Sequence, residues 1–279
     1  CPSANAIHLL NPMSQQMDVM RVSLLPGLLM TAARNIQRRS LRIQLYEMGR
    51  CFIRDADKTI RQHWHLAFLV TGMRSKEQWG VVQRPMDFYD LKGDLTRILG
   101  DSLAGSVEYK PLTDASMPTY RCAVFHPGQS AGLYMNGEWV GVLGKLHPSW
   151  VKTLGVFEDT YLCEWFKPDL LLVEDKPFSY APLSKYPSMR RDVSFWVEEN
   201  VVCQDMEQAI RESAGKFLTD LTLFDVYHSK DSDNKRRSLS WSLYFQHAER
   251  TLTDEEIQAC IQSVIASVES NCRASIRSE

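Results

Sequence analysis

The sequence of 279 residues lacks the patterns of membrane-spanning and disulfide-linked proteins. No apolar run approaches the roughly 20 residues of a membrane span, and the first residues show no signal-peptide pattern. The seven cysteines are scattered, contain no CxxC pair and are odd in number, so we expect reduced thiols rather than disulfides. These absences predict a cytoplasmic protein without a membrane partner.

Signatures of catalysis and metal binding are missing as well. There is no P-loop, no HExxH, and no GxGxxG that opens a helix. His63 and His65 would lie on one side of a strand, but no third ligand is visible, so no metal site is predicted. Asp87 and Asp90 could form a catalytic pair of carboxylates. The simpler interpretation is that they lie at the N-terminus of a helix, because a helix N-terminus favours anions. We therefore predict no catalytic residue and no bound cofactor.

The sequence has no excess of positive charge. The formal net charge is −2, which excludes a general polyanion binder and gives no reason to expect DNA binding. Residues 188–279 carry 11 basic and 16 acidic residues, a balance of −5. If this part binds nucleic acid, it must do so through individually placed contacts.

The chain divides at the stretch KPFSYAPLSKYP, residues 176–187, which holds three prolines and is typical of a linker. We expect one domain at residues 1–175 and a second at residues 188–279. Because the sequence opens on Cys1-Pro2 rather than Met, we also expect it to be a piece of a longer protein.

The first domain combines helices with antiparallel hairpins. Helices are predicted at residues 24–38 and 87–99, strands at 41–53, 63–72 and 161–166, and a hairpin at 125–148 that turns at Asn136-Gly137. This order indicates an α+β domain. One face of the first helix is apolar, and its residues recur at helical spacing: Leu25, Leu28, Leu29, Ala32 and Ile36.

The second domain has the order βαββαβ. Strands are predicted at residues 192–199, 218–229, 238–247 and 273–278, and helices at 203–215 and 254–272. This is the order of the ferredoxin-like sandwich, in which both helices cover one face of a four-stranded antiparallel sheet. Thr253 and Glu256 form the capping-box pattern of the second helix.

The other face of this predicted sheet is open. Side chains alternate along a strand, so one set in each strand is apolar and faces the helices, including Phe224, Val226 and Trp241. Such a face is either an ordinary wet surface or a platform on which a base stacks and its edge is read. The side chains on it are polar or aromatic: Ser194, Trp196, Asp225, Tyr227, Ser238, Ser240, Ser242, Tyr244, Ser275 and Arg277.

Eight short segments, taken together and in order, resemble the C-terminal part of the β subunit of bacterial phenylalanyl-tRNA synthetase. They are NPMSQQMDVMRVSLLPGLL, LYEMGRCF, DFYDLKGDL, HPGQSA, GVLGKLHP, YPSMRRDV, LFDVY and RTLTDEEI. By this resemblance the first domain is a class II synthetase-like module, an antiparallel sheet with helices that has lost its active site. The second domain is similar to a ferredoxin-like anticodon-binding domain.

The resemblance also implies what the first domain does. Class II active sites hold ATP with arginines on one strand and with a glycine-rich strand that ends in arginine. Here LYEMGRCFI keeps Glu47 and Gly49, but GVLGKLHP stands in place of the second signature, so ATP chemistry is not expected. The helix at residues 24–38 would form the interface of an (αβ)2 heterotetramer, leaving an exposed apolar patch in the free chain: Leu25, Leu28, Leu29, Ala32 and Ile36.

Carried over position by position, the anticodon contacts of the family fall on Ser194, Asp225, Tyr227, Ser238 and Arg277. Tyr227 would stack on the first anticodon base, a guanine, and Asp225 would accept from its N1 and N2 edge. The sequence departs from the family at Ser194 and Ser240, which replace alanines, and in loop 228–237, which lacks a glycine after the tyrosine. Candidate contacts to the RNA backbone are Arg190, Arg191, Lys235, Arg236 and Arg237.

The resemblance therefore implies a tRNA-binding, non-catalytic part of phenylalanine-tRNA ligase, an enzyme of protein biosynthesis. Its partners would be tRNA(Phe) and the α subunit, which uses ATP and Mg2+ to attach phenylalanine to the tRNA. Two alternatives stay open from the residues alone: a scaffold protein that binds no RNA, and a self-sufficient synthetase-like enzyme.

Overall fold

The computed structural model forms two compact units, Cys1–Pro177 and Phe178–Glu279. The predicted linker, residues 176–187, falls partly outside the residues that the structure describes. The described residues are 7–14, 18–54, 59–112, 123–168, 183–228 and 236–277.

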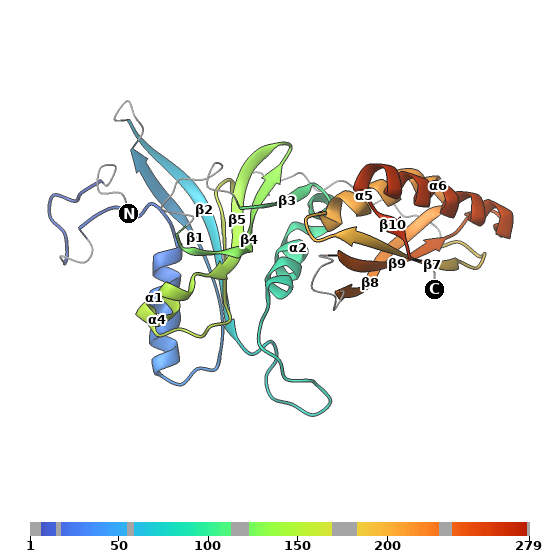
Figure 1. The fold of residues 1–279 in the computed structure, drawn as a ribbon. Helices are drawn as coiled ribbons and strands as arrows, with labels where there is room; N and C mark the ends of the chain where they lie inside the picture. Colours follow the sequence, from blue (N-terminus) through green and yellow to red (C-terminus); the bar gives the residue numbers. More distant parts are fainter. Residues whose placement is uncertain are drawn as a thin grey trace. The chain divides into compact units, whose positions relative to one another are not determined.

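The first unit is built on a six-stranded antiparallel sheet (Figure 1). Asn136 and Gly137 join β4 (Phe125–Met135) to β5 (Glu138–Leu146) with φ values of 52° and 77°, the left-handed conformation that favours an Asn-Gly turn. The predicted hairpin is therefore confirmed. In spatial order the strands are β1 (Arg42–Arg54), β2 (Ile60–Gly72), β6 (Thr160–Trp165), β5 (Glu138–Leu146), β4 (Phe125–Met135) and β3 (Val107–Pro111).

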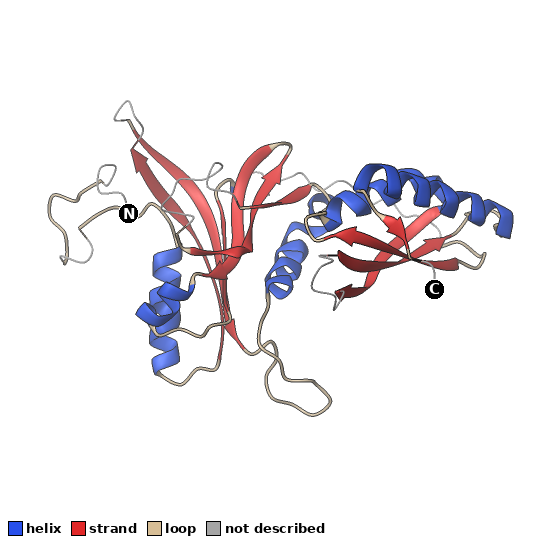
Figure 2. Ribbon diagram, viewed as in Figure 1, coloured by secondary structure: helices blue, strands red, loops and turns tan. Residues whose placement is uncertain are grey.

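Helices cover both faces of this sheet (Figure 2). Helices α1 (Leu25–Gln37) and α4 (Pro148–Leu154) pack on one face, and α2 (Phe88–Ala104) packs on the other. The central strand β6 is consequently buried on both sides, with Leu162 in the core under α1 and Cys163 in the core under α2. A capping box of Asp87 and Asp90 starts α2, which confirms the interpretation of these two carboxylates as a helix N-terminus.

The apolar stripe of α1 is part of the core of the first unit. Its first four side chains are at most 6% exposed, and the fifth is partly buried against the same cluster. That cluster includes Ile43, Leu69 and Leu162 of the sheet, so the sheet of the same chain already covers the stripe. The expected exposed apolar patch is therefore wrong for all five of its residues: Leu25, Leu28, Leu29, Ala32 and Ile36.

We expect Leu28→Ala to lower the free energy of unfolding by about 2 to 5 kcal/mol, because it removes buried methyl groups and leaves a cavity between α1 and the sheet. Met30→Ala is the matched control, since Met30 lies on the same helix but is 44% exposed, and a change within about 0.5 kcal/mol is expected. Urea unfolding of both variants checks this. Equal midpoints for the two variants would contradict the core assignment.

The second unit is a four-stranded antiparallel sheet with both helices on one face (Figure 1). The element order βαββαβ is as predicted, and α6 begins with the predicted capping box of Thr253 and Glu256. A short 3-10 helix, Gly215–Phe217, leads from α5 into β8. In spatial order the strands are β10 (Ser275–Ile276), β7 (Met189–Glu198), β9 (Arg236–Phe245) and β8 (Leu218–His228), and the helices are α5 (Cys203–Ala214) and α6 (Asp254–Cys272).

Strand β8 has two register shifts against β9, one between Leu218 and Asp220 and one between Leu223 and Asp225. Leu223 pairs with Trp241 and Asp225 pairs with Ser240, so Phe224 is an extra residue in a β-bulge. The prediction that Phe224 faces the helices is wrong: its side chain is 50% exposed and contacts Arg190 on the opposite face. Beyond the bulge the alternation resumes, which leaves Asp225 and Tyr227 on the predicted open face.

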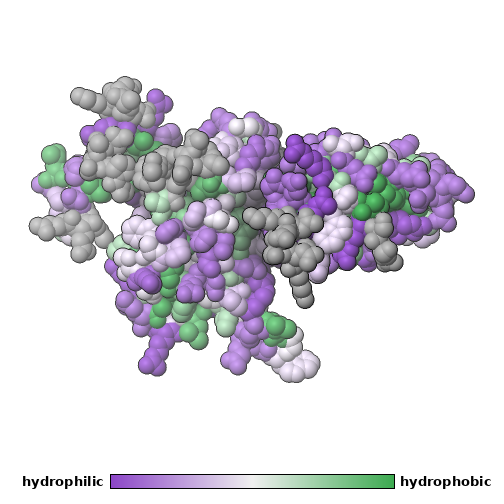
Figure 3. Space-filling view, viewed as in Figure 1, coloured by the Kyte–Doolittle hydropathy of each residue, from purple (hydrophilic) through white to green (hydrophobic). Residues whose placement is uncertain are grey.

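The described surface is mostly hydrophilic in the view of Figure 3, and its apolar residues form small separate patches. Among the described helices, none is both long and apolar enough to cross a membrane. The five cysteines within the described ranges form no disulfide, and burial raises the pKa of the Cys163 thiol above its ordinary value.

Candidate nucleic-acid interface

The open face of the second unit brings the five predicted anticodon-contact residues together. Ser194 pairs with Ser240, and Ser240 in turn pairs with Asp225, so these three residues form one row across the sheet. In the next row Ser238 lies between Trp196 and Tyr227. Of the predicted set, Ser194, Asp225, Tyr227 and Arg277 are accessible to solvent, whereas Ser238 is fully buried beneath its neighbours.

A compact cluster of two rings and one guanidinium forms at one end of this face. We call it the Tyr227 cluster, and it consists of Trp196, Tyr227, Ser238 and Arg277. The two rings meet edge to face, with centroids 6.1 Å apart and planes at 73°. The Arg277 guanidinium lies 5.2 Å from the Trp196 ring centre and 5.5 Å from that of Tyr227. Two aromatic planes and a cation are thus available to a stacked base.

Backbone and hydroxyl contacts hold Arg277 in this cluster. Its main-chain N–H donates to the Ser194 carbonyl at 2.8 Å, which extends the pairing of β10 with β7. Its Nη1 donates to the Ser238 Oγ at 3.3 Å. Ser238 therefore acts as the floor that positions the guanidinium rather than as an exposed contact, since its own side chain is buried.

Trp196 is a member of the cluster that was not among the predicted site residues. Strand alternation had placed it on the open face, and only its contacts with Tyr227 and Arg277 reveal that it belongs to the site. The distance between Trp196 and Tyr227 along the chain explains why the sequence did not indicate the contact, because the two residues meet only across β9.

Serine hydroxyls line the middle of the face. Ser194 and Ser240, which replace the alanines of the resembled family, bond to each other with their Oγ atoms 2.8 Å apart. Ser242 donates to the Asp192 carboxylate at 2.8 Å. Small side chains leave this part of the sheet without a bulky obstacle, and Asp225 stands exposed beside it. The Asp225 carboxylate is thus not buried, although it lies in the middle of a largely apolar strand.

A second group, the Phe224 cluster, consists of Arg190, Asp192, Phe224 and Tyr244. The Arg190 guanidinium lies 5.6 Å from the ring centre of Phe224 and 5.9 Å from that of Tyr244. It donates two hydrogen bonds to Asp192, at 2.8 and 3.0 Å. These bonds, with a further one from Ser242, hold the pKa of the Asp192 carboxyl below its ordinary value. The ion pair fixes the guanidinium beside both rings.

The five candidate contacts to an RNA backbone do not share one surface. Arg190 belongs to the open face and pairs with Tyr244, whereas the exposed Arg236 lies at the other end of β9, where it pairs with Glu198. Arg191 points to the helix side and pairs with Asp254 at 2.6 Å, and Arg237 donates to the Val201 carbonyl at 2.6 Å. Lys235 lies outside the described residues, as does most of loop 228–237.

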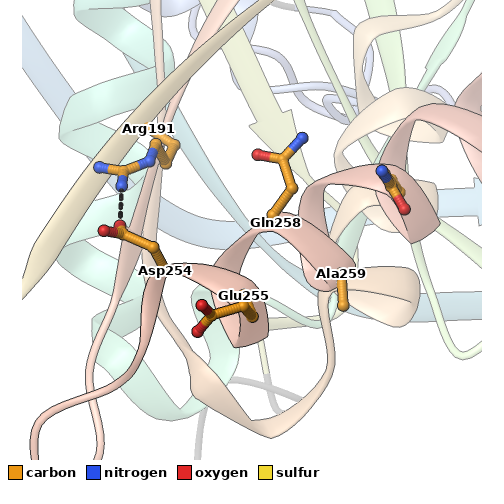
Figure 4. Close-up of a pocket in the computed structure, with 6 residues that line it drawn as sticks. Arg191, Asp254, Glu255, Gln258 and Ala259 are labelled. Atoms are coloured by element: carbon orange, nitrogen blue, oxygen red, sulfur yellow. Dashed lines mark hydrogen bonds and ion pairs between the residues drawn. The ribbon is translucent and has the colours of Figure 1, made fainter.

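Arg191 instead borders a shallow pocket on the helix side (Figure 4). The pocket has a volume of about 620 Å3, and the Arg191–Asp254 ion pair closes one side of it. Polar side chains from α6 make up most of its wall, among them Glu255 and Gln258. It contains no aromatic side chain for stacking, so it does not add to the open face.

In the first unit, Glu47 and Gly49 of the segment that resembles a class II signature lie against Arg21 of the same chain. The Arg21 guanidinium donates to the Glu47 carboxylate and to the Arg50 carbonyl. A side chain in place of Gly49 would collide with Arg21. The glycines of GVLGKLHP are explained by strand packing, since a Cβ on Gly141 would lie 2.7 Å from the carbonyl of Glu164.

A buried polar group lies at the start of α1. Cys51, His65 and Glu164 offer ligand atoms within 4.8 Å of one another, so the third ligand that the sequence did not reveal is present in space. The Glu164 carboxylate is nevertheless occupied: it accepts from Ser23 Oγ at 2.8 Å and from the Leu24 N–H at 2.9 Å, and His65 Nδ1 lies 2.9 Å away. A helix N-terminus favours an anion and disfavours a cation, so we assign Glu164 the role of a buried helix cap.

We expect Glu164→Ala to destabilise the first unit by about 1 to 3 kcal/mol for each buried donor that it leaves without an acceptor. Glu158→Ala is the control, because this exposed carboxylate should change stability by no more than about 0.5 kcal/mol. Thermal melts in a metal-free buffer with chelator measure both. A wild-type chain that loses stability on addition of chelator would contradict the cap and favour a bound metal.

Two family models match the chain. One, described as the phenylalanyl tRNA synthetase beta chain CLM domain, matches residues 2–165. The other, described as the ferredoxin-fold anticodon binding domain, matches residues 184–277, which include the whole open face.

Curated relatives give the same result over nearly the full chain. The phenylalanine–tRNA ligase beta subunit of Aromatoleum aromaticum is 32% identical over 99% of this chain and 34% of its own length. Those of Pseudomonas putida and Pseudomonas savastanoi pv. phaseolicola are 35% and 36% identical, with the same two coverages. The chain thus spans about a third of the length of the relatives that it matches.

Proposed function

The chain belongs to the phenylalanyl-tRNA synthetase β-chain family, and on that premise we propose that it binds the anticodon region of tRNA(Phe). The observation that carries the proposal is the Tyr227 cluster. Two aromatic rings and an arginine converge on the open face of the unit that matches the anticodon-binding family model. The overall charge of residues 188–279 is negative, so recognition depends on these placed groups rather than on general attraction.

In this proposal each group on the face has a separate task. Tyr227, 41% exposed, offers its ring to the first anticodon base. Asp225, exposed one row away, accepts from the N1 and N2 hydrogens of a guanine, which an adenine does not offer in the same pattern. Arg277 stays beside the ring, where its cation adds to stacking and lies close to the phosphate of a bound nucleotide.

The rest of the reaction would take place on another chain. We propose that this chain assembles with the α subunit of a cytoplasmic (αβ)2 ligase, in which the α subunit uses ATP and Mg2+ to attach phenylalanine to tRNA. Contacts with that subunit cannot involve the apolar stripe of α1 without unfolding it, because the stripe is core. Outward positions of the helix, such as Met30 and Arg34, are the ones left for a partner.

The proposal predicts that Tyr227→Ala weakens binding of tRNA(Phe) to the chain by about 1 to 3 kcal/mol, or roughly 5- to 150-fold, because a stacking plane is lost. Tyr227→Phe keeps the ring and should bind nearly as well as the wild type. Asp225→Asn should reduce the preference for guanine over adenine at the first anticodon position by about 1 to 3 kcal/mol. Filter binding at one fixed salt concentration measures these affinities.

Trp241→Ala separates recognition from folding in the same experiment. Trp241 is 2% exposed and packs under the helices, so its loss should cost stability of about 3 to 5 kcal/mol. If Tyr227→Ala melts as early as Trp241→Ala and binds tRNA normally while folded, Tyr227 is a packing residue and the proposal fails.

We also propose that this chain alone does not activate phenylalanine. Arg21 donates to Glu47 and lies against Gly49, and the glycines of the second segment, GVLGKLHP, serve strand packing. Exchange of pyrophosphate into ATP with phenylalanine should therefore stay at the level of a buffer blank. Activity that remains with the chain through successive purification steps would instead support a self-sufficient enzyme.

A further inference from the structure

Phe224 is an exposed aromatic side chain that the packing of the fold does not use. Leu221 and Leu223 of the same strand turn toward the helices, whereas the bulge carries Phe224 to the open face with half of its surface in water. An apolar ring left in this position gives up hydrophobic stabilisation that the regular alternation of the strand would provide. A ligand that stacks on the ring would make use of this exposure.

The ring lies within reach of the Tyr227 cluster. Tyr227 follows Phe224 by three positions on β8, which corresponds to about 10 Å of strand. The exposed carboxylate of Asp225 lies between them. Four-stranded sheets that bind single-stranded RNA use aromatic side chains on one face to stack two or three bases in succession. The spacing of these two rings fits neighbouring bases and is too long for a single base to cover both.

The Phe224 ring lies beside a cation that other side chains hold in place. The Arg190 guanidinium lies 5.6 Å from its centre and is fixed by two hydrogen bonds to Asp192. Asp192 is held in turn by the Ser242 hydroxyl at 2.8 Å. These contacts hold the Arg190 guanidinium beside the Phe224 ring in the free protein. A base that stacks on the ring therefore does not have to immobilise the guanidinium.

We propose that Phe224, supported by Arg190, is a second stacking position that takes the base of the nucleotide adjacent to the one held at Tyr227. The inference rests on the proposed function, because it assigns a further contact to the same RNA-binding face. It makes the open face a track for at least two consecutive anticodon-loop bases, with the serine side chains between β7 and β9 as its floor.

The first test measures binding of the full chain to the anticodon stem-loop RNA of tRNA(Phe) by fluorescence anisotropy. Phe224→Ala should weaken binding about 5- to 150-fold, and Phe224→Tyr, which keeps a ring, should bind nearly as well as the wild type. Val226→Ala is the matched control, since Val226 is similarly exposed on the same strand but pairs with core-facing Leu239. Circular dichroism and thermal melts show whether each variant is folded.

The second test assigns each ring to its nucleotide, with stem-loops that carry a single abasic nucleotide at successive positions of the loop. The effect of Tyr227→Ala should vanish on one of these RNAs, and the effect of Phe224→Ala should vanish on the RNA whose abasic site is next to it. The double variant should show the product of the two single effects on intact RNA, because the contacts are separate.

The outcomes separate this inference from the proposed function. If Phe224→Ala binds like Val226→Ala while Tyr227→Ala is weakened, the second position is wrong and anticodon binding stands. If both variants lose their effects on the same abasic RNA, there is one stacking site, and the inference is also wrong. If neither variant binds more weakly than Val226→Ala, the proposed function fails together with the inference.

Discussion

The antiparallel pairing of β7 with β9 is the constraint from which the candidate binding surface follows. Val193 lies opposite Trp241 and Ser194 lies opposite Ser240, so a single register settles the core under the helices and the serine floor above it. A shift of one residue would turn Trp241 toward water and Ser240 into the core. The arrangement of the open face therefore depends on the apolar contacts under the helices, on the opposite side of the sheet, which no ligand touches.

In the first unit, by contrast, helices cover both faces of the sheet. A fully buried central strand carries one carboxylate, Glu164, and the start of α1 supplies the hydroxyl and N–H groups that satisfy it. This contact fixes the helix against the sheet at its first turn, and the apolar stripe then continues the packing along its length.

The periodicity of apolar residues predicted most helices and strands, but it did not show what their apolar faces pack against. The spacing of Leu25, Leu28 and Leu29 indicates a buried stripe, and it would look the same against the chain's own sheet or against another subunit. The structure shows that the sheet covers it. Strand β8 illustrates a second limit, because a bulge adds one residue without any signal in composition. Phe224 then lies on the face opposite to the predicted one, whereas Asp225 and Tyr227 keep their predicted face.

The sequence by itself determined the α+β class, the βαββαβ order, the capping box of Thr253 and Glu256, and the face on which Asp225 and Tyr227 lie. These depend on local rules, since capping, turn chemistry and alternation act over a few residues. Tertiary structure alone decided the meeting of Trp196 with Tyr227 and Arg277, the exposure of Phe224, and the group of Cys51, His65 and Glu164. Such contacts join residues far apart in the chain, and they exist only after the strands between them have paired, which no short stretch of sequence records.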